Sequence, residues 1–345
     1  MSSLALFRPS RRLGRWRVQR VGLSLAVLSI LSLVLGVLAP SSTALAAAHV
    51  PSAPTHPMFF HSRTIVDSSV QSFHFFSSTE AAVLGGGSNL WLEQGPFGTV
   101  PPSRVLVDST ANSFQAISDT EFLVLEGGFL ALLRAPSFAF GGRTYIDANV
   151  QGYQWLLDSK IMVLGDDGKL WLEFAPFGHF PPARVQVDGN VSSFQAISDT
   201  EILVKGTDGK LWLEFGPFGH VPPNRLWVDD SVSSFQAISD TQILVEGTDG
   251  KLWLEHAPFG QVPPPGRVQV DGSVLDFRFI DSNTVVVEGQ NENLWLEHAP
   301  FGHVPPARQQ IDASVSFGNG FQPLSTTLIG VRGNDNVLWL EQAPF

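Results

Sequence analysis

The chain has 345 residues, of which 43% are hydrophobic and only 15% are charged, and it contains no cysteine. This composition excludes a disordered chain, disulfide bonds, a cysteine nucleophile and a cysteine-based zinc site. Six of the 21 basic residues precede residue 21, so residues 49–345 carry 15 basic and 32 acidic side chains, a net charge of −17; we expect no nucleic-acid partner, because such a surface repels phosphate.

Residues 1–48 are predicted to be a secretory signal peptide. Six arginines between residues 8 and 20 precede an uninterrupted apolar run at 21–39, and small-x-small sites end at Ala46 and Ala48. The pattern is typical of a bacterial secreted protein, and the Pro-containing residues 49–61 are predicted to be a linker. The alternative is an uncleaved membrane anchor, since the run is close to bilayer-spanning length; only then do we expect a membrane contact.

Residues 62–345 repeat one motif seven times. The tryptophan of a Leu-Trp pair occurs at Trp91, Trp171, Trp212, Trp253, Trp295 and Trp339. The spacings from Trp171 onward are 41, 41, 42 and 44 residues, and the spacing of 80 before Trp171 leaves room for a degenerate unit in which Ala131 replaces tryptophan. A period of about 41 residues is typical of a four-stranded propeller blade. We therefore predict an all-β fold, a seven-bladed β-propeller of four-stranded blades over residues 62–345.

The fourth repeat shows the predicted strands in chain order. They lie at residues 194–197, 201–205, 210–215 and 225–229, with a tight turn at Thr207-Asp208-Gly209. The last strand has an Arg-x-x-Val-Asp pattern that also occurs at residues 63–67, before the first blade, whereas the last repeat ends without it. We predict that this N-terminal strand completes the last blade as its outermost strand and closes the ring.

The third and fourth strands of each repeat place a tryptophan, a glutamate and an arginine where they can share a face. The alternation of side chains along a strand puts Trp212 and Glu214 on one side, and Arg225 lies on the neighbouring strand. The second repeat is broken, because Ala131 and Leu133 accompany Arg143. The complete sets are Trp91, Glu93 and Arg104; Trp171, Glu173 and Arg184; Trp212, Glu214 and Arg225; Trp253, Glu255 and Arg267; Trp295, Glu297 and Arg308; and Trp339, Glu341 and Arg63.

Two interpretations of these sets are open. An indole face beside a charged donor and acceptor suits a sugar ring, and six such sites would bind multivalently. The same residues can also be structural, because Arg–Glu pairs on adjacent strands and arginine over tryptophan are ordinary contacts. A buried and paired trio favours the structural interpretation, and an open cleft with a bare indole face favours a ligand.

The strings VKGTDGKLWLE and VDGNVSSFQAIS resemble repeats of the seven-bladed bacterial propeller lectins of the Photorhabdus fucose-binding type. The likeness extends roughly from Val66 to Glu341. It implies that the Arg-x-x-Val-Asp strand is outermost and that ligands lie between blades near the outer edge. This chain departs from the family after the Leu-Trp pair, where those lectins have further aromatics and this chain has Glu-x-Ala-Pro-Phe-Gly.

Other polar residues are expected to be structural. Seven aspartates end the fourth strands and are predicted to cap turns: Asp67, Asp108, Asp147, Asp188, Asp229, Asp271 and Asp312. The first strands carry no carboxylate pair at their shared position, which holds His74, Gln115, Gln154, Gln195, Gln236, Arg278 and Gln322.

We therefore predict a secreted, non-catalytic, lectin-like propeller that binds glycans at up to six outer-rim sites between blades, with no cofactor and no metal. The alternative is a protein-interaction scaffold that holds a protein partner on a ring face. A degenerate propeller glycoside hydrolase is the third possibility.

Overall fold

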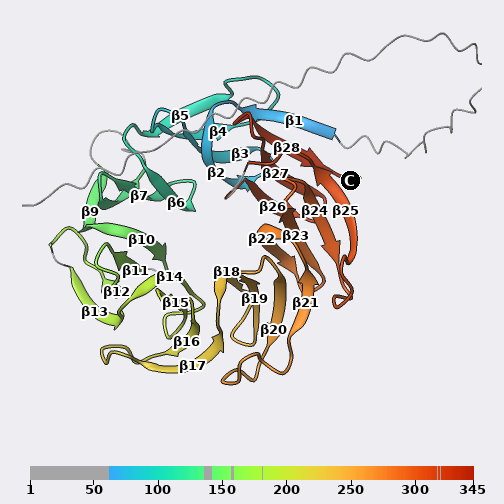
Figure 1. Ribbon diagram of the computed structural model, residues 1–345. Coiled ribbons are helices and arrows are strands. Elements are labelled where there is room, and N and C mark those ends of the chain that lie inside the picture. Colours follow the sequence, from blue (N-terminus) through green and yellow to red (C-terminus); the bar gives the residue numbers. More distant parts are fainter. Residues whose placement is uncertain (1–61, 136–141, 157–158, 181, 317, 319) are drawn as a thin grey trace, which may run out of the picture. The chain divides into compact units, whose positions relative to one another are not determined.

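The computed structural model describes residues 62–135, 142–156, 159–180, 182–316, 318 and 320–345; the predicted signal peptide and linker lie outside them. The described residues form seven four-stranded antiparallel sheets arranged in a ring, as predicted (Figure 1). In this part of the chain there is no helix long and apolar enough to cross a membrane.

Blades 1 to 4 follow one another along the chain. Blade 1 comprises β2 (Val70–Ser77), β3 (Glu80–Gly85), β4 (Leu90–Gln94) and β5 (Ser103–Asp108). Blade 2 comprises β6 (Ser113–Ser118), β7 (Glu121–Glu126), β8 (Phe129–Arg134) and β9 (Arg143–Ala148). Blade 3 comprises β10 (Val150–Trp155), β11 (Lys160–Gly165), β12 (Leu170–Phe174) and β13 (Ala183–Asp188). Blade 4 comprises β14 (Val191–Ala196), β15 (Glu201–Gly206), β16 (Leu211–Phe215) and β17 (Asn224–Asp229).

Blades 5 to 7 continue this order and end with the closing blade. Blade 5 comprises β18 (Val232–Ala237), β19 (Gln242–Gly247), β20 (Leu252–His256) and β21 (Val268–Asp271). Blade 6 comprises β22 (Val274–Asp281), β23 (Thr284–Gly289), β24 (Leu294–His298) and β25 (Ala307–Asp312). Blade 7 comprises β26 (Phe321–Ser325), β27 (Leu328–Arg332), β28 (Leu338–Gln342) and β1 (Ser62–Asp67).

The N-terminal strand closes the ring, as predicted. Blade 7 has the strand order β1-β28-β27-β26, and β1 pairs antiparallel with β28 from Ser62 opposite Gln342 to Asp67 opposite Leu338. The last blade therefore takes its outermost strand from the opposite end of the described chain, and the ring has no unpaired strand at the junction.

The core lies between neighbouring blades. The second strand of each blade is a nearly continuous apolar run, and in β15 Ile202, Leu203 and Val204 are fully buried. Ile202 and Val204 pack with Met162 and Leu170 of blade 3, so each blade buries one sheet face against its neighbour. The phenylalanine of the Pro-Phe-Gly loop packs against these clusters in five blades, at Phe97, Phe177, Phe218, Phe259 and Phe301.

A β-bulge recurs in the outermost strand of every blade. In blade 4, Trp212 is opposite Trp227 but the next pair is Leu211 opposite Asp229, so Val228 is the extra residue. Simple alternation would place Asp229 on the same face as Arg225. The bulge instead turns the aspartate into the boundary with the next blade, and both Val228 and Asp229 are buried there.

Candidate functional site

The structure brings each predicted tryptophan, glutamate and arginine together. Glu214 and Arg225 are direct cross-strand partners in β16 and β17, and the Arg225 guanidinium lies 4.2 Å above the centre of the Trp212 ring. The distance from the guanidinium to the indole centre is 4.2 or 4.3 Å in all six complete sets. A sugar ring would stack on a free face of the indole. The arginine therefore covers one of the two faces on which a sugar could stack.

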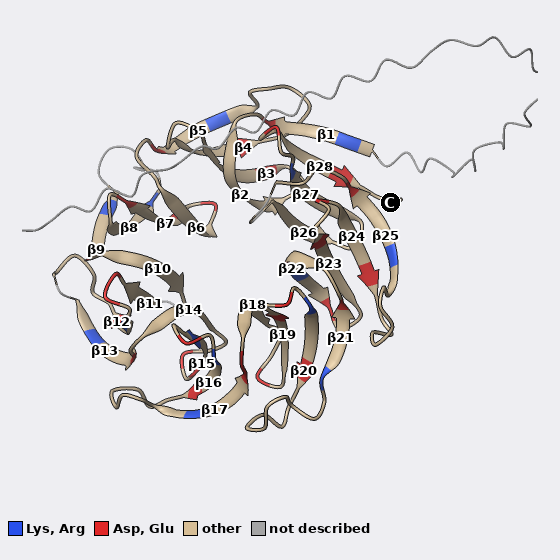
Figure 2. Ribbon diagram, viewed as in Figure 1, with Lys and Arg blue, Asp and Glu red and all other residues tan. Residues whose placement is uncertain are grey.

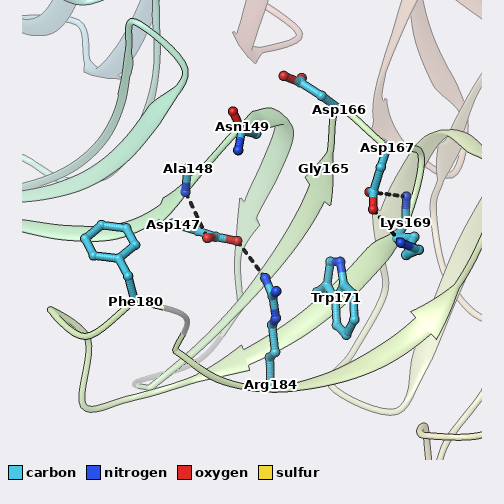
Figure 3. A pocket seen from close by; sticks show the side chains of 10 residues that line it. All are labelled: Asp147, Ala148, Asn149, Gly165, Asp166, Asp167, Lys169, Trp171, Phe180 and Arg184. Atoms are coloured by element: carbon cyan, nitrogen blue, oxygen red, sulfur yellow. Dashed lines mark hydrogen bonds and ion pairs between the residues drawn. The ribbon is translucent and has the colours of Figure 1, made fainter. Parts of the chain in front are cut away.

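A fourth residue, which the sequence analysis did not assign to this set, completes the arrangement. Arg184 Nη1 is 3.0 Å from Asp147 Oδ2, and Asp147 belongs to the preceding blade (Figure 3). Every blade has such a pair, including Arg63 with Asp312 across the closing junction and Arg143 with Asp108 in the degenerate blade. The pairs form a continuous series of ion pairs around the ring. The arginines lie on the outermost strands, except that Arg267 directly precedes its strand (Figure 2).

The predicted turn-capping role of the aspartates is also observed. Asp147, Asp188, Asp271 and Asp312 each accept a hydrogen bond from the next backbone N–H through Oδ1, at 2.6 to 2.8 Å. The second oxygen faces the arginine of the next blade, so one carboxylate serves both the turn and the junction. The signal for this second role was present in the sequence, because the aspartates and arginines recur in equal number.

The glutamates are completely buried. Glu93, Glu173, Glu214, Glu255 and Glu297 are 0% exposed, and burial together with the neighbouring aspartate raises the pKa of each to about 9. Burial disfavours the ionised form, and the aspartate beside it adds a second negative charge that one arginine cannot balance. Glu341 in the closing blade has its pKa raised only to about 7, because Arg63 Nε lies 2.7 Å from its carboxylate.

Blade 2 compensates for its missing residues. Ala131 is opposite Tyr145, which supplies the aromatic ring from the outer strand instead of the third strand, and Arg143 lies 6.0 Å from the centre of this ring. Glu126 replaces the missing glutamate and accepts a hydrogen bond from Arg143 at 2.7 Å. The arginine therefore keeps an aromatic ring and two carboxylates even where the repeat has diverged.

Open grooves lie beside these sets at three blade junctions. The grooves have volumes of about 690, 450 and 380 Å³ and contain Trp171, Trp212 and Trp295 respectively. Each groove is lined by the inter-blade Arg–Asp pair and by the turn between the second and third strands, and an apolar residue of the Pro-Phe-Gly loop completes it: Phe180, Val221 or Val304. In these three blades the tryptophan and the arginine of the predicted set thus line a small groove at the rim.

A buried and paired trio was expected of a structural role, and the geometry of the six sets favours that role. The glutamate is buried, the arginine is paired with two carboxylates, and one indole face is covered. These contacts join strand to strand and blade to blade. Ligand binding by the exposed remainder is a separate proposal.

One acidic pair was not anticipated. Asp276 of β22 is opposite Glu288 of β23, beside Arg278 and Arg332. Glu288 is 0% exposed, and burial with the nearby Asp276 raises its pKa to about 7. Glu288 therefore lies out of contact with solvent in this structure, whereas Asp276 is partly exposed. Within the described ranges, no group of three or more histidine, aspartate or glutamate side chains is arranged to hold a metal ion.

No protein-family model matches the sequence, and no curated protein matches it. Solved structures do match the ring. The WD40 β-propeller domain of Doa1 is 12% identical with a TM-score of 0.57, over 82% of this chain and 97% of that one. The chain shares the β-propeller fold of this domain. Hsv2 of Kluyveromyces lactis matches with 12% identity and a TM-score of 0.54, over 82% of this chain and 98% of Hsv2. The C-terminal WD40 domain of Sif2 matches with 13% identity and a TM-score of 0.55, over 84% of each chain.

At these identities the likeness shows the fold alone. The predicted resemblance to propeller lectins therefore holds for the seven-bladed ring, whereas nothing in these matches points to the fucose-binding family.

Proposed function

We propose that this propeller is a non-catalytic scaffold that binds protein partners on its outer rim. WD40-like propellers typically serve as protein-interaction scaffolds, and the fold of this chain is of that kind. The buried, paired state of the rim carboxyls supports a role in stability more than in catalysis. The repeat pattern also allowed a protein-interaction scaffold with its partner on a ring face; here the proposed partner surface is the rim instead.

The distribution of exposed apolar side chains carries the proposal. Among the described residues, eight large hydrophobic side chains are 37% to 53% exposed. Seven belong to outermost strands or to the loops that precede them, and Phe129 begins the third strand of blade 2. They are Val100, Val105, Phe129, Tyr145, Phe180, Val221, Leu226 and Val304. Val100, Phe180, Val221 and Val304 occupy the same position of the Pro-Phe-Gly loop in four blades. We infer that these apolar residues, three of which line a polar groove, are contact points of a protein interface.

The test places a photo-crosslinking amino acid at Val221 and, in a parallel sample, at the exposed control position Gln342. Partners captured only from Val221 are purified, and their affinity is measured by calorimetry. The combined variant Val100→Ser, Phe180→Ser, Val221→Ser and Val304→Ser is expected to weaken binding at least about tenfold. The control Gln94→Ser should leave the affinity unchanged. Equal capture from both positions, or equal affinity of the combined variant, would contradict the proposal.

Sugar binding at the rim is the second candidate, because grooves of 380 to 690 Å³ contain a tryptophan, an arginine and an aspartate. One indole face is covered, so a sugar would have to contact the indole edge and the groove walls. A glycan array followed by calorimetry tests this candidate. Binding should be lost in Trp212→Ala at the blade 4 groove but not in Phe129→Ser in blade 2. No sugar binding by the folded wild-type protein would eliminate it.

A further inference from the structure

The inner strands are linked from blade to blade by glutamine side chains. Gln154 Oε1 accepts a hydrogen bond from the Ala196 N–H at 2.8 Å, and Gln154 Nε2 donates to the Ala196 carbonyl at 3.2 Å. The amide therefore binds the edge of the next inner strand as another peptide group would. The other four glutamines accept a hydrogen bond from the residue at the equivalent position of the next blade: Gln115 from Trp155, Gln195 from Ala237, Gln236 from Phe279 and Gln322 from Phe75. We call these five residues the latch glutamines.

Two junctions lack a latch glutamine, for different reasons. Arg278 holds the position in blade 6, and the residue that it would face in blade 7 is Pro323, which has no N–H to donate. His74 holds the position in blade 1, and the residue that it would face in blade 2 is Ala116. Ala116 is opposite Phe122 just as Ala196 is opposite Ile202, so its N–H and carbonyl have the same direction. Among the described residues, no side chain takes the Ala116 N–H.

A pocket of about 500 Å³ lies where these two junctions flank blades 1 and 7. Ala116, His74 and Arg278 line it, together with Ser72, Ser113, Phe73, Phe114 and Phe321. Burial lowers the pKa of His74, which keeps its imidazole neutral near pH 7. Arg278 Nη1 donates to Asp276 Oδ1 at 2.6 Å, so its charge is balanced within the protein. The pocket is therefore polar but without net charge, and it has apolar walls.

We propose that this inner-strand pocket binds an uncharged carboxamide, namely a glutamine side chain presented by a partner segment. The ligand amide would accept from the Ala116 N–H and donate to the Ala116 carbonyl, as the latch glutamines do elsewhere. The glutamine methylenes would contact the phenylalanine rings. A neutral amide suits the site better than a carboxylate, because a carboxylate cannot donate a hydrogen bond to the Ala116 carbonyl. The partner class rests on the proposed scaffold function.

The probe is N-acetyl-glutamine N-methylamide, titrated into protein labelled with ¹⁵N-alanine. The Ala116 amide resonance is expected to shift in a saturable way. The glutamate and methionine analogues should bind at least about tenfold more weakly, because neither donates to the carbonyl. No saturable shift of Ala116, or equal shifts with all three probes, would overturn the proposal.

Two variants at one position sharpen the test. His74→Gln restores the latch, so the Ala116 resonance should move without any probe and the probe should no longer shift it. His74→Ala leaves the Ala116 groups open and should bind the probe at least as well as the wild type. Undiminished probe binding by folded His74→Gln would refute the site. The titration uses a small amide and no protein partner, so its outcome is independent of the rim experiment.

Discussion

At the residue scale, one arginine organises each blade junction. Arg225 contacts the Trp212 ring, Glu214 of its own blade and Asp188 of the preceding blade. A single guanidinium balances one carboxylate, and burial together with the neighbouring Asp188 raises the pKa of Glu214. The buried glutamate therefore keeps its proton and can donate a hydrogen bond to the aspartate. Each complete junction is close to neutral even though it holds two acidic residues.

The first prediction concerns Arg225→Gln, which removes the cation from a junction that contains two nearly buried carboxyls. We expect a loss of about 1–3 kcal/mol in unfolding free energy, because the carboxyls of Asp188 and Glu214 both lose the guanidinium that they contact in a buried junction. Urea denaturation measures the change. The matched control is Arg134→Gln, whose ion pair with Glu121 is solvent-exposed and should cost less than about 0.5 kcal/mol. Equal losses of unfolding free energy in the two variants would show that the junction ion pair stabilises the fold no more than an exposed ion pair does.

The second prediction concerns the pH dependence of Glu214→Gln. The pKa of Glu214 is raised from 4.5 to about 9, so the folded state holds a proton that the unfolded state releases. Its contribution to stability is therefore fully present below about pH 4.5 and declines as the pH rises toward about 9. Glutamine mimics the protonated acid, so the variant should be more stable than the wild type near pH 9 and lose less stability over this range.

Thermal melts across this pH range test the second prediction. Glu201→Gln, on the neighbouring strand and partly exposed, is the control and should keep the wild-type slope. A Glu214→Gln curve parallel to that of the wild type would mean that Glu214 is ionised in the folded protein.

At the element scale, ring closure depends on β1. This strand supplies the fourth strand of blade 7, and it also supplies Arg63 and Asp67, which take part in ion pairs on both sides of the closing blade. The chain has no cysteine, so no disulfide supports this junction. Strand pairing and these two ion pairs hold the described ends together.

The third prediction is that deletion of residues 62–67 destabilises blade 7 in preference to the other blades. Backbone N–H groups of β28 lose their partners, so hydrogen exchange there should accelerate at least about tenfold while β16 in blade 4 changes little. Replacing Ser62, which is exposed at the start of β1, by alanine is the control and should leave exchange unchanged. A deletion variant with wild-type melting and exchange would refute closure by β1.

The sequence predicted the elements well because the repeat displays each strand seven times. The Trp212, Glu214 and Arg225 grouping followed from alternation along two paired strands. The role of Asp229 did not, because a bulge breaks that alternation, and a bulge leaves no signal in a hydrophobic pattern. The latch glutamines recur at one position of the repeat, but their partners lie on the next blade, 40 to 43 residues further along the chain for four of them and at the other end of the ring sequence for Gln322. A single strand therefore cannot reveal these partners.

At the scale of the whole molecule, burial changes the charge. Residues 62–345 contain 15 basic and 32 acidic side chains, a formal charge of −17. Five buried glutamates have a pKa of about 9 and are protonated at neutral pH, which lowers the charge to about −12. The ring is still acidic. The negative charge that repels anions lies on the exposed aspartates of the turns and not in the buried junctions.

The fourth prediction concerns the net charge of the folded protein, which is less negative than the formal charge because the buried glutamates are protonated. Glu214→Gln replaces a group that is already uncharged, so the electrophoretic mobility of the folded protein at about pH 7 should not change. Glu201→Gln changes the same atoms at a partly exposed position and should shift the mobility by about one unit charge. Under denaturing conditions both variants should differ from the wild type equally, because the unfolded chain exposes both side chains to solvent. A full unit shift for folded Glu214→Gln would mean that the junction holds two ionised carboxylates against one arginine.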